Sequence, residues 1–165
     1  MALIIGRFQP FSNNHMEVLE TIKRDFGPKK ILLGVGVSGK MDERNFLNFE
    51  EIKEMITPIL NKLGVKYEIK AIPDINNPPK YARHVKLFFP EMNEDNTQIF
   101  TDNPYTGDCF DKHGNNYKVT MPKILSKIRA TDVRKLMKEG ENWEKLVPKP
   151  VAEYIKKNNC LERLG

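Results

Sequence analysis

The sequence contains little cysteine and no long hydrophobic run. Cys109 and Cys160 are the only two cysteines among 165 residues, too few and too unpatterned for a disulfide framework or a zinc site. No apolar run approaches the roughly 20 residues that a membrane-spanning helix needs. The first apolar run is not preceded by a basic leader or followed by a small-residue cleavage site, so no signal peptide is expected. We therefore expect a soluble protein of the reduced cytoplasm, with no membrane partner.

Two common nucleotide-binding motifs are missing as well. The pattern GxxxxGK[ST] occurs nowhere in the chain, which excludes a P-loop enzyme. GVGVSG at residues 34–39 follows an apolar run, but it does not open a helix as the glycine motif of a dinucleotide-binding fold does. The glycine pattern therefore supports neither a P-loop kinase nor a dehydrogenase.

Positively charged residues only slightly outnumber negatively charged ones. The 27 Lys and Arg residues outnumber the 22 Asp and Glu residues, which gives a net charge of +5. This balance suits anionic partners, nucleotides among them. The basic residues are scattered among acidic ones and form no cluster with aromatic residues, so nucleic acid is not expected as a partner.

Short apolar runs alternate along the chain with segments of helical periodicity. We expect strands at residues 2–5, 30–37, 67–72, 97–101 and 117–120. We expect helices from residue 13 or 14 to 26 and at 49–63, 82–89, 130–138 and 143–158, with a turn-rich loop at 102–117. This alternation predicts an α/β fold with a doubly wound parallel sheet and C-terminal helices. The chain length and the absence of repeats or linkers predict one domain over residues 1–165.

The stretch GRFQPFSNNH, residues 6–15, joins the first expected strand to the first expected helix. Doubly wound sheets bind ligands at the carboxyl ends of their strands. A helix that begins there offers free backbone N–H groups and a dipole that attracts anions. His15 could donate a hydrogen bond to a phosphate oxygen, and Arg7 could bind one through its planar fork. The stretch is therefore a candidate phosphate site.

Two motifs together resemble the nucleotidyltransferase superfamily. GRFQPFSNNH is similar to its [HT]xxH motif, usually HxGH, and IRATDVR at residues 128–134 is similar to its ISSTxxR-like motif. GRFQPF and the segment from TDVRKLMKEG onward resemble the archaeal-type nicotinamide-nucleotide adenylyltransferases in particular. The resemblance implies a Rossmann-like nucleotidyltransferase fold. It also implies that ATP and nicotinamide mononucleotide are joined by in-line attack on the α-phosphate, which gives NAD and pyrophosphate.

The resemblance also implies which residues bind ATP. His15, Arg134 and Arg7 would be the catalytic residues, since they hold the reacting phosphates. The implied ATP-binding residues are Gly6, Arg7, Phe8, Ser12, His15, Asp102, Arg129, Thr131 and Arg134. Mg²⁺ is expected as a bridge between substrate phosphate oxygens, without a metal site made by the protein itself.

The chain departs from the family motifs at four positions. These are Ser12 in place of the first His, Asn14 in place of Gly, Arg129 in place of a Ser, and Ile52 in place of a phosphate-binding Arg. Lys40 or Arg44, in the loop before the second helix, could substitute for that missing Arg. The departures leave open a catalytically silent nucleotide-binding module as the alternative to an enzyme.

A second set of residues is implied for the mononucleotide. In the family, a segment after the third strand carries an Asp, an Asn and a Trp that recognise nicotinamide, and IPDINNPPKY at residues 72–81 is its counterpart. Asp74 matches the Asp, Asn77 lies beside the Asn position, and Tyr81 offers a flat ring in place of the Trp. Asn103, in TDNP, completes the set. Another phosphorylated acceptor, or CTP in place of ATP, remains an alternative, and the resemblance implies a homo-oligomer.

Overall fold

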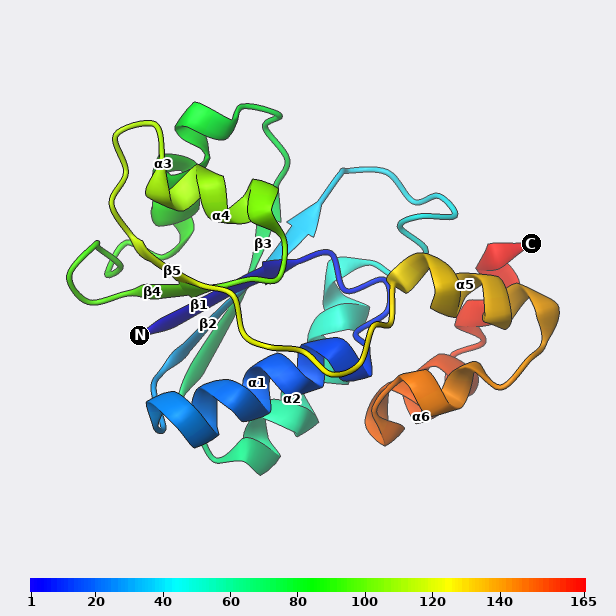
Figure 1. Cartoon of the computed structure of the whole chain (residues 1–165). Coiled ribbons are helices and arrows are strands. Elements are labelled where there is room, and N and C mark those ends of the chain that lie inside the picture. Colours follow the sequence, from blue (N-terminus) through cyan, green and yellow to red (C-terminus); the bar gives the residue numbers. More distant parts are fainter.

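A parallel five-stranded sheet forms the centre of the protein. The structure is a computed structural model that describes residues 1–165 (Figure 1). All strand pairs are parallel, and the strand order is β3-β2-β1-β4-β5. The strands are β1 (Ala2–Gly6), β2 (Ile31–Val37), β3 (Tyr67–Pro73), β4 (Gln98–Phe100) and β5 (Lys118–Thr120). The predicted doubly wound α/β fold is confirmed.

The direction in which strands are added reverses beside β1. The chain runs outward from β1 through β2 to β3, and it then crosses to the other side of β1 to form β4 and β5. At such a reversal the loops after the two central strands diverge to opposite faces, which opens a crevice at the carboxyl edge of the sheet. The fold therefore favours a ligand site after β1 and β4.

Helices cover both faces of the sheet (Figure 1). The larger buried cluster joins one face to α1, α2, α5 and α6, and the smaller one joins the other face to α3 and α4. The helices are α1 (Asn13–Phe26), α2 (Phe49–Leu63), α3 (Pro78–Phe88), α4 (Pro104–Asp111), α5 (Ala130–Glu139) and α6 (Lys149–Lys157). None of them has both the length and the apolar character needed to cross a membrane.

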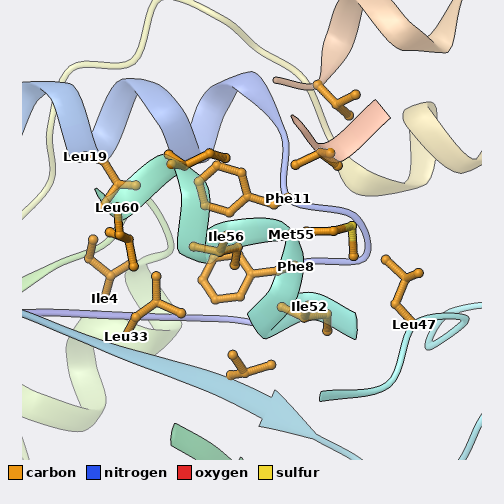
Figure 2. Close-up of a cluster of buried hydrophobic side chains, with 14 of the residues drawn as sticks. Ile4, Phe8, Phe11, Leu19, Leu33, Leu47, Ile52, Met55, Ile56 and Leu60 are labelled. Atoms are coloured by element: carbon orange, nitrogen blue, oxygen red, sulfur yellow. The ribbon is translucent and has the colours of Figure 1, made fainter. Parts of the chain in front are cut away.

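The strand β1 is buried on both faces, which explains its continuous apolar sequence. Ala2 and Ile4 belong to the larger cluster, and Leu3 between them belongs to the smaller one. Figure 2 shows the larger cluster, in which Phe8 and Phe11 from the loop after β1 lie among residues of α2. Only 2% of Phe8 and 1% of Phe11 is exposed. The loop that contains the first motif is thus anchored in the core.

The prediction of a loop at residues 102–117 is wrong in part, because this segment contains α4. Asn103 caps this helix by accepting a hydrogen bond from the backbone N of Tyr105 at 3.0 Å. Pro104 suits the first turn, where no backbone N–H is needed. The helix spans 8 residues, and its few buried positions give the sequence too weak a periodicity to reveal it.

Two other predicted helices have different limits. α3 begins at Pro78 instead of residue 82, because Asn77 caps it and prolines occupy its first turn. The single helix expected at 143–158 is divided at Pro148, which lacks the N–H that a continuous helix needs. The 3₁₀ turn η1 (Trp143–Leu146) precedes the break, and η2 (Cys160–Leu164) follows α6.

Candidate active site

The loops after β1, β3 and β4 enclose a cavity of about 440 Å³ at the carboxyl edge of the sheet. We call it the crevice cavity. The four residues predicted for the mononucleotide all line it, namely Asp74, Asn77, Tyr81 and Asn103. Four of the residues predicted for ATP line it too, namely Gly6, Arg7, His15 and Asp102.

A second cavity, of about 450 Å³, lies between the loop that joins β2 to α2 and the start of α5. We call it the basic cavity because Lys40, Arg44 and Arg134 line it. Arg7 and His15 line both cavities. A ligand that occupied the two cavities together would therefore pass these two side chains.

His15 is held in one orientation by the turn that begins α1. The backbone N–H of Ser12 donates to Nδ1 of His15 at 2.9 Å, and the Ser12 hydroxyl lies 3.1 Å from the same atom. The imidazole also packs against Phe8 and Phe11, with ring centroids 4.9 and 5.2 Å apart. Because Nδ1 accepts from a backbone N–H, the ring proton of neutral His15 is on Nε2.

The surroundings of His15 keep its ring neutral. Burial lowers the pKa of His15 to about 4, and the nearby Asp102 carboxylate opposes that shift to a smaller extent. At neutral pH the side chain is therefore an uncharged hydrogen-bond donor through Nε2–H. Such a donor can bind a phosphate oxygen without exchanging a proton with it.

The unfolding free energy of the wild type is expected to fall more steeply between about pH 6.5 and about pH 4 than that of His15→Gln. Unfolded His15 takes up a proton near its ordinary pKa of 6.5, whereas folded His15 does so only near 4. Acid therefore favours the unfolded chain in this window, and the stabilisation is complete above it. Urea titrations across the window measure the difference. The same pH dependence in both proteins would contradict a neutral His15 in the folded protein.

The backbone after β1 has a tight path that depends on glycine. A Cβ atom at Gly6 would lie 3.0 Å from the ring of Phe8. Phe8 itself has a φ of 51°, which non-glycine residues seldom adopt. This path turns the Phe8 ring under His15 and directs Arg7 out toward the two cavities.

Arg134 is fixed at the wall of the basic cavity. Its Nη1 donates to the backbone oxygen of Gln9 at 2.8 Å. Burial lowers the pKa of Arg134, and the positive charge of Arg44 lowers it further. Two cations that are held close enough to disfavour each other make a site that a polyanion would stabilise.

A buried isoleucine, Ile52, occupies the position in α2 where the family has a phosphate-binding Arg. Ile52 is 1% exposed and belongs to the larger cluster, so it cannot reach a ligand. Lys40 and Arg44, the residues expected as substitutes, both line the basic cavity. The cavity thus receives its cations from the loop before α2 and not from the helix itself.

Arg7 and Asp74 form an ion pair at the mouth of the crevice cavity. Arg7 Nη2 lies 2.7 Å from Asp74 Oδ2, and both side chains remain partly exposed. Tyr81 lies deeper, and burial, followed by the charge of Asp74, raises its pKa to about 12. The Tyr81 hydroxyl therefore stays protonated, and the ring contributes a flat apolar wall.

Asn77 and Asn103 are the N-cap residues of α3 and α4. Each caps a helix at the edge of the crevice cavity, and each uses its side-chain oxygen to accept a backbone N–H, at 3.3 Å from Lys80 and 3.0 Å from Tyr105. Their amide NH₂ groups are left for other partners. The cavity therefore has two uncharged donors as well as its charged pair.

Three of the predicted ATP-binding residues line neither cavity. Ser12 is 1% exposed and lies behind His15. Arg129 is exposed, and its nearest partner is Asp132 at 3.2 Å. Thr131 is exposed in the first turn of α5. A contact of these residues with ATP therefore stays a prediction.

Sequence reasoning missed several lining residues. Tyr105 and Thr106 line the crevice cavity from the first turn of α4, a segment whose sequence predicts a loop. Asn14, a departure from the motif and one of the two possible caps of the first helix, lies inside α1, and Ser12 is the cap. The side chain of Asn14 donates to the backbone O of Ile128 at 2.6 Å and accepts from the backbone N of the same residue at 3.2 Å. Asn14 thus joins the first motif to the start of the second.

A search of curated proteins finds relatives over nearly the whole chain. The chain is 33% identical over 169 residues to the nicotinamide-nucleotide adenylyltransferase of Thermococcus sibiricus, with 98% of this chain and 86% of the relative covered. The enzyme of the same name from Picrophilus torridus is 32% identical, with 99% and 94% covered. The chain belongs to the nicotinamide-nucleotide adenylyltransferase family. It is therefore an adenylyltransferase, an enzyme of the transferase class, as the two motifs predicted.

Solved structures agree with this family in fold. A bifunctional NMN adenylyltransferase/ADP ribose pyrophosphatase of Francisella tularensis, in complex with AMP and a manganese ion, superposes with a TM-score of 0.75 at 18% identity. It covers 99% of this adenylyltransferase, which spans only 51% of the Francisella chain. The nicotinic acid mononucleotide adenylyltransferase of Plasmodium falciparum, in complex with APC, gives a TM-score of 0.63 at 16% identity, with 98% and 96% covered. A scan against models of protein families finds no match.

Proposed function

We propose that this adenylyltransferase joins ATP to nicotinamide mononucleotide. An oxygen of the mononucleotide phosphate attacks the α-phosphorus of ATP and forms a new P–O bond. The bond from the α-phosphorus to the bridging oxygen of the β-phosphate breaks, and pyrophosphate leaves. The products are NAD and pyrophosphate, and no covalent enzyme intermediate forms.

The observation that carries this proposal is the division of charge between two adjoining cavities. The basic cavity gathers Lys40, Arg44 and Arg134, which suits a triphosphate. The crevice cavity has only one cation, Arg7, which it shares with the basic cavity. We therefore assign the β- and γ-phosphates of ATP to the basic cavity, the mononucleotide to the crevice cavity, and the reacting α-phosphate to their junction.

Catalysis in this arrangement is positioning together with stabilisation of phosphoryl charge. His15 Nε2–H donates to a non-bridging oxygen of the α- or β-phosphate, where negative charge grows in the transition state. Arg7 and Arg134 bind phosphate oxygens through their planar forks. Ser12 acts through its bonds to Nδ1, which keep the imidazole in the donating tautomer.

Mg²⁺ would reach this site through the substrates. No group of three or more His, Cys, Asp or Glu side chains is arranged to hold a metal ion. Lys40, Arg44 and Arg134 of the basic cavity are cations and would not hold Mg²⁺, so oxygens of the substrates would hold it. When bound, Mg²⁺ would neutralise charge on the leaving pyrophosphate. The manganese ion of the Francisella structure supports a divalent metal of this kind.

The charge of the crevice cavity favours the nicotinamide acceptor over its acid form. Asp74 and Asp102 line the cavity, and Arg7 is already paired with Asp74. The positively charged pyridinium ring and uncharged amide of nicotinamide suit an acidic cavity. A nicotinate carboxylate would add a like charge there.

A panel assay for pyrophosphate release tests the proposed reaction. ATP and CTP are each combined with nicotinamide mononucleotide, nicotinic acid mononucleotide, flavin mononucleotide and phosphopantetheine. We expect the highest kcat/KM with ATP and nicotinamide mononucleotide. A preference for another acceptor, or for CTP, would contradict the proposal. Binding of ATP without turnover of any acceptor would indicate the silent nucleotide-binding module.

Tyr81→Ala is expected to raise the KM for the mononucleotide and leave the KM for ATP nearly unchanged. Loss of one aromatic stacking partner costs about 1–3 kcal/mol, which corresponds to about 5- to 150-fold in binding. Tyr81→Phe keeps the ring and is the matched control, so it should behave like the wild type. Steady-state kinetics with each substrate varied in turn measures the effect. Equal changes in both KM values would argue against stacking on Tyr81.

We also propose that the enzyme works in the cytoplasm and forms a homo-oligomer. The support is the resemblance of the sequence to a family whose members tend to self-associate. Light scattering coupled to gel filtration is expected to give a mass that is a multiple of the chain mass of 19.1 kDa. A monomer over the micromolar range would contradict self-association.

A further inference from the structure

The loop that supplies two cations to the basic cavity has no regular structure of its own. Residues 38–48, which we call the basic loop, contain no helix or strand, and most of the loop is exposed. Lys40 and Arg44 nevertheless line the cavity from this loop. Long flexible side chains on a mobile loop would contribute little to binding, because ordering them costs entropy. Contacts that fix the position of the basic loop would therefore strengthen the binding of a ligand by Lys40 and Arg44.

A turn inside the basic loop sets the direction of Arg44. One carboxylate oxygen of Asp42, Oδ1, accepts hydrogen bonds from the backbone N of Arg44 and of Asn45, both at 2.9 Å. The side-chain amide of Asn45 donates to the same oxygen at 2.9 Å. The local shape of the loop is thus fixed. An ion pair between Glu43 of the loop and Lys138 ties this part of the loop to α5, and contacts at the far end of the loop join it to α2 and the C-terminal turn.

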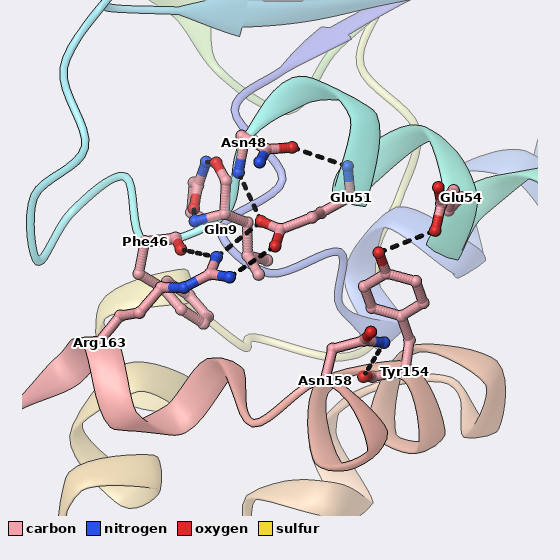
Figure 3. A network of polar contacts seen from close by, with 9 residues as sticks. Gln9, Phe46, Asn48, Glu51, Glu54, Tyr154, Asn158 and Arg163 are labelled. Carbon is pink, nitrogen blue, oxygen red and sulfur yellow. Dashed lines mark hydrogen bonds and ion pairs between the residues drawn. The ribbon is translucent and has the colours of Figure 1, made fainter.

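Arg163, near the C-terminal end of the chain, fastens that far end (Figure 3). Its Nη1 donates to the backbone oxygen of Phe46 at 3.0 Å. Its two terminal nitrogens also bind the carboxylate of Glu51 in a bidentate pair, each at 2.7 Å. Glu51 in turn accepts from the backbone N of Asn48 at 2.9 Å, where α2 begins. One guanidinium therefore joins η2, α2 and the basic loop.

Gln9 holds the same end of the loop from the side of the active site. Its side chain donates to the backbone O of Leu47 at 2.8 Å and accepts from the backbone N of Leu47 at 3.0 Å. The backbone oxygen of Gln9 accepts from Arg134. The adjacent Phe46 and Leu47 are 1% and 2% exposed. The loop end is thus clamped between the first motif on one side and Arg163 on the other.

We propose that Arg163 is a positioning residue for the triphosphate of ATP. It holds the end of the basic loop through Phe46 and Glu51, and the loop presents Arg44 and Lys40 to the phosphates. Arg163 lines neither cavity, so it acts only through these residues. The inference rests on the proposed binding of ATP phosphates in the basic cavity. It adds the C-terminal turn to the parts of the chain on which that binding depends.

Tyr154 provides the control for a purely structural role. It lies on α6, and its hydroxyl donates to Glu54 of α2 at 2.8 Å, so it also fastens the C-terminal part of the chain to α2 (Figure 3). It makes no hydrogen bond to the basic loop. Tyr154→Phe removes this tie alone. If Arg163 merely stabilised the fold, the two substitutions would lower the melting temperature and leave the affinity for phosphates unchanged.

The test is calorimetric binding of pyrophosphate, and separately of ATP, to the full chain well below its melting temperature. We expect Arg163→Ala to weaken both by about tenfold, within the range for residues coupled in one hydrogen-bonded network. Tyr154→Phe should bind like the wild type. Arg163→Lys keeps the charge but not the fork, so it should lie between Arg163→Ala and the wild type. It also serves as the deciding variant if Arg163→Ala does not fold.

A double-mutant cycle with Arg44 separates this inference from the proposed function. If Arg163 acts through Arg44, Arg163→Ala should weaken pyrophosphate binding much less in an Arg44→Ala background than in the wild type. Wild-type affinity in Arg163→Ala and Arg163→Lys, with weakened binding in Arg44→Ala, would overturn the positioning role alone. Unchanged affinity in Arg44→Ala and Lys40→Ala would overturn the proposed phosphate site itself.

Discussion

His15→Ala is expected to lower kcat by about 100- to 1,000-fold, the loss seen when one donor to developing oxyanion charge is removed. The reason is geometric. Nδ1 accepts a hydrogen bond from the backbone N–H of Ser12, so the single N–H group of the neutral ring is at Nε2, on the side away from Ser12. The dissociation constant for ATP should change far less than kcat, since the donor is aimed at charge that grows in the transition state.

The control for His15→Ala is His113→Ala. His113 is exposed and lines neither cavity, so its replacement should leave kcat unchanged. Single-turnover kinetics with saturating ATP separates the chemical step from product release. A His15→Ala enzyme with a raised KM for ATP and an unaltered kcat would exclude His15 from the chemistry. Because the pKa of His15 is about 4, the kcat of the wild type should show no step from this residue between about pH 6 and about pH 8.

Much of this fold could be predicted because its signals are local. Residues 2–5 and 31–37 are continuous apolar runs, as a sheet covered on both faces requires. The first motif follows the first run directly, so its place at the carboxyl edge of the sheet followed from the order of the elements. The helix α4 could not be predicted in the same way. Asn103 and Pro104 are local signals for its start, but its polar sequence and few buried positions leave the helix that follows without a clear periodicity.

The long-range contacts that shape the active site could not be predicted from the sequence. Asn14 bonds to Ile128, which is 114 residues away in sequence. Glu17 accepts from the backbone N of Leu125 at 2.8 Å and of Ser126 at 2.9 Å, and it thereby ties the segment before α5 to α1. Each of these side chains is an ordinary polar residue on a helix. Nothing in its local pattern indicates a distant partner.

The structure accounts for three of the four departures from the family motifs. Ile52 lies in the core and supplies no cation to the site, whereas Lys40 and Arg44 bring positive charge to the basic cavity from the loop before α2. The side chain of Asn14, which a Gly would lack, docks the two motifs against each other. Ser12 supports His15 from behind. These arrangements retain a donor and several cations around the junction of the cavities, which supports an active enzyme over a silent nucleotide-binding module.

Arg134→Lys is expected to lower kcat/KM for ATP by about 10- to 100-fold, although the charge is kept. One terminal nitrogen of Arg134 already donates to the backbone oxygen of Gln9 at 2.8 Å, which leaves its other donors for the triphosphate. A lysine ammonium is a single point and cannot span both positions, so it would lose at least one bond to a charged oxygen, worth about 1.5–3 kcal/mol. Arg83→Lys is the matched control, because Arg83 is exposed on α3 and lines neither cavity. Steady-state kinetics with ATP varied measures the loss, and pyrophosphate binding should weaken in parallel. Wild-type kinetics in Arg134→Lys would mean that the second motif only starts a helix and that the phosphates of ATP bind elsewhere.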